Sequence, residues 1–117
     1  MEKKAYVNYD GEDDILSIVK SDFINHSVRI ADVILDFDND MRIVGVELIN
    51  ATEFFEAFEL SKDDLKNIDK AKLSVHYSED WAIVKITIFL KDRITPIVKD
   101  FTIPSLEEQK QLIGLEA

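Results

Sequence analysis

Residues 32–52 constrain the fold of this chain more than any other stretch. Two runs rich in Val, Ile and Leu flank residues 38–41, an Asp-Asn-Asp-Met cluster, and turn-forming residues between apolar runs are typical of a β-hairpin. A two-residue turn at Asn39 and Asp40 needs positive φ angles, which Asn and Asp tolerate. The sequence therefore predicts a central hairpin that leads into a helix after Asn50.

The pairing in this hairpin follows from the position of the turn. With Asn39 and Asp40 at the tip, Leu35 faces Val44, and side chains alternate between the two faces of the hairpin. The apolar face consists of Val33, Leu35, Phe37, Val44, Val46 and Leu48. The mixed face, which we expect to be partly exposed to water, consists of Ile34, Asp36, Ile43, Gly45 and Glu47. A slip of one residue would turn the apolar set outward, so the register should be strongly specified.

The same stretch has acidic residues at the spacing of a calcium-binding loop. Asp36, Asp38, Asp40 and Glu47 match the D-x-D-x-D pattern with a distal Glu. Such a loop needs Gly at its sharp turn, where this chain has Met41. In the expected hairpin, Glu47 lies roughly 20 Å beyond Met41 at about 3.3 Å per residue, too far to share an ion with Asp38. We therefore expect an acidic solvated turn, with no metal and no cofactor.

Composition predicts a single α+β domain over residues 1–117. This length suits one domain, and a hydrophobic content of 46% is enough for a core. The net charge of −10 disfavours binding to nucleic acids and to anionic membranes. The chain has no cysteine, which excludes disulfides and Cys nucleophiles. Because neither a signal peptide nor a long apolar segment is visible, we expect a cytoplasmic protein.

Two short helices should follow the central hairpin and pack against it. Asn50 and Glu53 have the spacing of a capping box, and so have Ser61 and Asp64. The first helix would turn an aromatic stripe to the core, formed at helical spacing by Ala51, Phe54, Phe55 and Phe58. The second helix would cover residues 62–69.

The remaining strands form a hairpin before the central one and a meander after the helices. They are expected at residues 5–9, 15–20, 73–77, 81–90 and 96–103. Residues 21–27 are expected to be a connection, and residues 105–113 a terminal helix. Pro96 cannot donate a hydrogen bond to a neighbouring strand, so the last strand should lie at an edge of the sheet or start at this residue.

The meander has two apolar faces, although a single sheet layer needs only one. One face is wholly apolar and must pack against the helices. The other contains Trp81, Ile83 and Phe89, more large apolar side chains than a solvated face usually has. We expect a second layer to cover them. A homodimer is favoured over the terminal helix as this cover, because two-fold dimers are the commonest oligomers.

Two segments are similar to the signatures of a known family. Residues 9–18, YDGEDDILSI, look like its opening signature, and residues 32–52, ending in Asn50-Ala51-Thr52, look like its second. Together they resemble the prokaryotic domain of unknown function 2283 over about residues 5–55, with residues 56–117 as an extension that shares the core. Met41 stands where the family usually has Gly, and Ser17 where it usually has an aromatic residue. The resemblance implies a small strand-rich domain that ends in a helix, with no established activity, and a loose association with small toxin-like partners.

No catalytic motif stands out in the chain. His26 and His76 lie in unrelated contexts, and there is no phosphate-binding Gly loop and no nucleophile elbow. A carboxylate cleft, if one exists, would draw on Glu12, Asp14, Asp36 and Glu47. The favoured hypothesis is a non-catalytic binding or assembly domain with a protein partner or a second copy. The alternatives are an antitoxin-like domain that neutralises a small basic partner, and a carboxylate-based enzyme.

Overall fold

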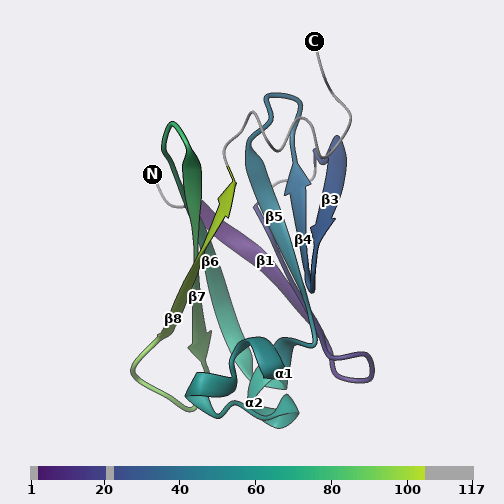
Figure 1. Ribbon diagram of the computed structural model, residues 1–117. Helices are drawn as coiled ribbons and strands as arrows, with labels where there is room; N and C mark the ends of the chain where they lie inside the picture. Colours follow the sequence, from purple (N-terminus) through teal and green to yellow (C-terminus); the bar gives the residue numbers. More distant parts are fainter. Residues whose placement is uncertain (1–2, 21–22, 105–117) are drawn as a thin grey trace.

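A computed structural model of the protein describes residues 3–20 and 23–104. Eight antiparallel strands form one sheet in the order β3-β4-β5-β2-β1-β6-β7-β8. The sheet curls into a half-barrel, with the helices at one end (Figure 1). The elements are β1 (Lys3–Asp10), β2 (Ile15–Val19), β3 (His26–Ile30), β4 (Val33–Phe37), β5 (Ile43–Ile49), α1 (Ala51–Phe54), the 3-10 helix η1 (Glu56–Phe58), α2 (Lys62–Lys66), β6 (Ile68–Tyr77), β7 (Trp81–Leu90) and β8 (Ile97–Pro104).

Strand β1 joins the two halves of the sheet. Its residues 6–10 pair with β2, whereas its residues 3–5 pair with β6. In Figure 1 it runs obliquely from one half to the other. One apolar cluster contains residues from both halves, including Leu35 and Val46 from the first and Leu73 and Ile86 from the second.

The first hairpin and the C-terminal meander form from the segments that the sequence predicts to be strands. Tyr9 faces Leu16 across β1 and β2. Val75 faces Val84, and Leu73 faces Ile86, across β6 and β7. Strand β8 is the last in the sheet order, which confirms the edge position predicted from Pro96. The predicted terminal helix at 105–113 lies outside the described residues.

The fold is mainly β, so the prediction of an α+β domain overestimated the helices. Strands account for 57% of the structure, whereas α1 has 4 residues and α2 has 5. Left-handed residues at Asn50 (φ 56°) and Glu59 (φ 55°) bound the first helical segment. The second helix stops early because Ile68 already pairs with Leu90 as part of β6. The predicted aromatic stripe is only partly core, since Phe55 is buried and Phe58 is exposed.

Strand β3 overlaps the segment that was predicted to be a connection. It pairs with β4, and Ile30 faces Val33 across a two-residue turn. Ala31 in this turn has a φ of 54°, a conformation that usually belongs to Gly in a hairpin turn. Because Ala31 is not a typical turn former, the sequence gives little sign of this hairpin.

A β-bulge shifts the register of the central hairpin, so the predicted register is wrong. Leu35 faces Val46, and Phe37 faces Ile43, with an irregularity between Asp36 and Phe37. Val44 is consequently the extra residue of the bulged strand. Ile43 lies in the core cluster, where Val44 was expected.

The tip of the hairpin also differs from the predicted two-residue turn. The Met41 N–H donates to the Asp38 carbonyl, and the Asp38 N–H donates to the carbonyl of Arg42. Met41 has a φ of 63°. A turn followed by a left-handed residue is a common three-residue hairpin loop, with Gly usual at that last position. Met41 therefore occupies a position at which glycine is usual.

Candidate functional site

Asp14 joins the two segments that resemble the family signatures. Its Oδ1 accepts a hydrogen bond from Tyr9 Oη at 2.6 Å, and its Oδ2 accepts one from Thr52 Oγ1 at 2.6 Å. The Thr52 N–H also donates to the carboxylate at 3.2 Å, and the Ala51 N–H donates to the Asp14 carbonyl at 2.9 Å. Asp14 therefore caps α1, the role predicted for Asn50, whose side chain makes no capping hydrogen bond.

The electrostatics of this cluster indicate a structural carboxylate. Burial raises the pKa of Asp14, but the hydrogen bonds from Thr52 and Tyr9 outweigh that effect and bring the pKa below its ordinary value. Burial and the hydrogen bond to Asp14 raise the pKa of the Tyr9 hydroxyl. Asp14 is thus ionised, and its oxygens accept hydrogen bonds from protein donors. These properties suit a residue that links two segments better than they suit a catalytic base.

Two other candidate carboxylates lie together on the outer face of the first half-sheet. Asp36 is only 2% exposed and accepts a hydrogen bond from Ser27 Oγ at 2.6 Å, so the expectation that it faces water is wrong. A Cβ at Gly45 would lie 2.6 Å from Asp36 Oδ2, so this position needs glycine. Burial and the charge of Asp36 raise the pKa of Glu47.

The structure does not gather the four candidate carboxylates into one cleft. Glu12 is exposed in the turn between β1 and β2, where its N–H donates to Asp10 Oδ1. In the calcium-like stretch, Asp38 Oδ1 accepts the N–H groups of Asp40 and Arg42 and thereby shapes the turn. Within residues 3–20 and 23–104, no group of three or more His, Asp or Glu side chains is placed to hold a metal ion.

The predicted interface residues lie on the outer face of the second half-sheet. We define this outer face as the residues that alternate with the core residues of β6, β7 and β8: Lys70, Lys72, Ser74, His76, Trp81, Ile83, Lys85, Thr87, Phe89, Val98, Asp100 and Thr102. In Figure 1, no other described element forms a second layer on it. Trp81 is 39% exposed and Val98 is 41% exposed.

The three predicted interface residues differ in how much water they meet. Trp81 is exposed and lies beside His76, at 6.4 Å between ring centroids. Ile83 and Phe89 are half-buried. The ammonium groups of Lys70 and Lys72 lie 4.8 and 5.7 Å from the centroid of the Phe89 ring. These cation–π contacts cover Phe89 with flexible charged side chains, which a partner can displace.

A groove continues the outer face around the open end of the half-barrel. It has a volume of about 250 Å³ and is lined by Asp40, Met41, Arg42, Tyr77, Ser78, Trp81 and Ala82. Tyr77 Oη accepts the N–H of Ile43 at 2.8 Å and so ties the two hairpin tips together. Local sequence patterns do not indicate that Tyr77 and Arg42 line a groove, because contact between the two hairpins depends on the curl of the whole sheet.

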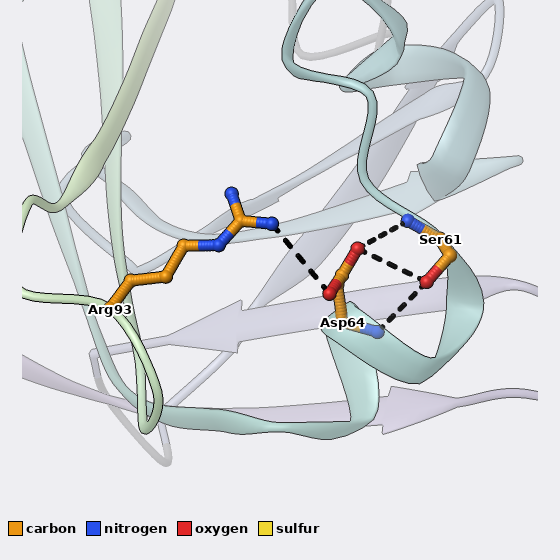
Figure 2. A network of polar contacts seen from close by, with 3 residues as sticks. All are labelled: Ser61, Asp64 and Arg93. Atoms are coloured by element: carbon orange, nitrogen blue, oxygen red, sulfur yellow. Dashed lines mark hydrogen bonds and ion pairs between the residues drawn. The ribbon is translucent and has the colours of Figure 1, made fainter.

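A larger hollow of about 580 Å³ lies at the helical end, lined by Phe58 and residues 92–97. Figure 2 shows the polar network beside it. Asp64 Oδ2 accepts the Ser61 N–H at 2.8 Å, and Asp64 Oδ1 lies 3.7 Å from Arg93 Nη2. The hydrogen bonds from Ser61 lower the pKa of Asp64. The capping box predicted from Ser61 and Asp64 is therefore confirmed, and it also anchors the connection between β7 and β8.

Comparison with known proteins agrees with the two signatures. Residues 6–51 match the model of a family described as "Protein of unknown function (DUF2283)". Over this stretch the chain is similar to the DUF2283 family. The match contains both residues of the Tyr9–Asp14 hydrogen bond and ends at Ala51, which confirms the resemblance drawn from the sequence.

One relative extends the likeness beyond the DUF2283 stretch. An uncharacterized protein of Methanocaldococcus jannaschii is 28% identical over 104 residues, which is 88% of each chain. That alignment is longer than the DUF2283 match, so it includes part of the chain outside residues 6–51. No solved structure matches this chain. Among the described residues, no helix has the length and apolar character needed to cross a membrane.

Proposed function

We propose that this chain is a non-catalytic binding or assembly domain, and that its contact surface is the outer face of β6, β7 and β8. The observation that carries the proposal is that Trp81, Ile83 and Val98 lie on a sheet face with no second layer among the described elements. A sheet is stable when its apolar faces are covered. Grouped large apolar side chains on an accessible face are typical of protein–protein contact sites.

The candidate carboxylates support this proposal because two of the four have structural roles. Asp14 caps a helix, and Asp36 is buried with Ser27. A carboxylate-based enzyme rests on the pair of Asp36 and Glu47, since a raised pKa such as that of Glu47 is typical of a general acid. An antitoxin-like role rests on the net charge of −10 and on the association with small toxin-like partners that the family resemblance implies. Neither the enzyme hypothesis nor the antitoxin hypothesis is supported by a surface feature comparable to the outer face.

The proposal is tested by capture from cells that express the chain, with two matched variants. Ile83→Lys places a charge at the centre of the outer face, whereas Ile34→Lys places one on the outward side of β4 in the other half-sheet. We expect proteins retained by the wild type, including untagged copies, to be retained by Ile34→Lys and lost with Ile83→Lys. Equal retention by all three folded chains would contradict the proposal.

A further inference from the structure

We infer that the partner of the outer face is a second copy of this chain, docked antiparallel about a two-fold axis. This inference rests on the proposed function and adds the identity and the orientation of the partner.

The outer face has opposite charges at its two ends. Lys70 and Lys72 lie at one end, beside Phe89. Glu79 and Asp80 lie at the other, in the exposed turn that precedes Trp81. One end of the face is therefore basic and the other acidic, although the chain as a whole is strongly acidic.

The middle of the face and its margin carry further charges. Lys85 faces Asp100 across β7 and β8, so the middle row has one charge of each sign. Asp69, next to Lys70, is the residue that the bulge in β6 leaves without a partner on β7. It is exposed beside Lys70, so it offsets part of the positive charge at that end, where Lys70 and Lys72 are in the majority.

A two-fold axis that crosses the strands near Lys85 brings opposite ends together. Trp81 and Phe89 are separated by about 26 Å along β7 at about 3.3 Å per residue, and Lys85 lies midway between them. Rotation about this axis sets Lys70 and Lys72 of each copy against the acidic turn of the other. It also brings Trp81 of one copy to Phe89 of its partner.

This orientation makes the charges at the two ends of the face complementary, while Lys85 lies beside Lys85 of the partner at the axis. A parallel arrangement would set lysines against lysines and acids against acids, which is unfavourable at an interface. A two-fold contact repeats each favourable pair twice and closes the assembly as a dimer. The apolar residues between the two ends are then covered by the same residues of the partner, which satisfies the need for a second layer.

The experiment is charge exchange, measured by sedimentation equilibrium. In Lys70→Glu/Lys72→Glu both ends of the face are acidic, and in Glu79→Lys/Asp80→Lys both ends are basic. We expect a dimer for the wild type and a monomer for each variant alone at the same concentration. A 1:1 mixture of the two variants should form a heterodimer, because each end then meets its opposite. Lys62→Glu/Lys66→Glu in α2 is the matched control and should remain dimeric.

Three results would overturn the inference. They are a monomeric wild type at every attainable concentration, a charge variant that dimerises like the wild type, and a mixture of folded variants that stays monomeric. A monomeric wild type that still captures another protein in an Ile83-dependent way would overturn self-association and leave the proposed function intact. Capture that does not depend on Ile83 would instead overturn the proposed function.

Discussion

Asp14 combines an unusual backbone conformation with a dense set of hydrogen bonds. Its φ of 56° lies in the left-handed region, which Asp and Asn tolerate better than other non-glycine residues. Its carboxylate receives hydrogen bonds from Tyr9 on β1 and from Thr52 at the start of α1. One side chain thereby fixes the first turn of the sheet against the end of the central hairpin.

Replacing Asp14 with Asn should lower the free energy of unfolding by about 1–3 kcal/mol, because hydrogen bonds to a charged acceptor are lost. Asn keeps the shape and tolerates the φ angle. Urea denaturation at pH 7 measures the loss, and Asp13→Asn at the exposed neighbouring position should change it by less than about 0.5 kcal/mol.

The same pair of proteins gives a pH test. The folded pKa of Asp14 lies below its ordinary value of 3.8, so its contribution is present above pH 3.8 and is lost as pH falls through the folded pKa. The stability difference between the wild type and Asp14→Asn should therefore shrink in acid. A difference that stays constant down to the lowest pH at which both chains fold would contradict the role of the carboxylate.

Side-chain roles in the central hairpin were predictable only up to the bulge. Alternation correctly places Leu35 and Val46 in the core. Beyond Phe37 one extra residue reverses the pattern, so Ile43 replaces Val44, and the sequence has no mark for such an insertion. The four candidate carboxylates could be named from the sequence, but the burial of Asp36 depends on a strand that the sequence did not reveal.

At the scale of elements, the hairpin of β3 and β4 depends on a strained turn residue. Ala31 is exposed and has a φ of 54°, whereas Asp32 is not among the residues with positive φ. A left-handed residue at the first turn position is usually Gly. Ala31 therefore stores strain that its side chain does not offset by packing.

Ala31→Gly should raise the free energy of unfolding by about 1 kcal/mol, because glycine removes the steric cost of the left-handed conformation. Thermal unfolding measures this as an increase in melting temperature. Asp32→Gly, at a position where φ is negative, should lower the melting temperature. An unchanged or lower melting temperature for Ala31→Gly would show that the turn is not strained.

Elements were predictable where local signals mark both ends. The first hairpin and the meander have acidic turns between alternating runs, and their strands pair as neighbours, as predicted. Capping boxes mark where a helix starts but not how long it continues, so α1 and α2 were expected to be longer than they are. Strand β3 lacked a turn signal at Ala31 and was missed.

At the scale of the whole molecule, β1 lets one sheet form two walls of a half-barrel. Where β1 passes from one neighbour to the other, Ala5 faces Ala71, and both side chains are buried. Small side chains leave room for the two walls to approach there. The pairing of β1 with β6 is remote in sequence, which is why the half-barrel was not predictable from local patterns.

Ala71→Leu should therefore lower the free energy of unfolding by about 1–3 kcal/mol through overpacking. Ala57→Leu at an exposed position of η1 is the matched control and should be nearly neutral. If the two half-sheets unfold as one unit, Trp81 fluorescence and circular dichroism should give coincident transitions for the wild type and both variants. Separate transitions would contradict a core shared by both halves.

The outer face of β6, β7 and β8 is the central claim, and the fluorescence of Trp81 tests it most directly. Trp81 is the only tryptophan of the chain and lies on that face. As protein concentration rises through the range in which sedimentation shows a dimer, its emission should shift to shorter wavelength and quenching by acrylamide should weaken. Ile83→Lys should abolish both changes. Dimer formation with unchanged Trp81 emission and quenching would contradict the account, because the contact would then lie elsewhere.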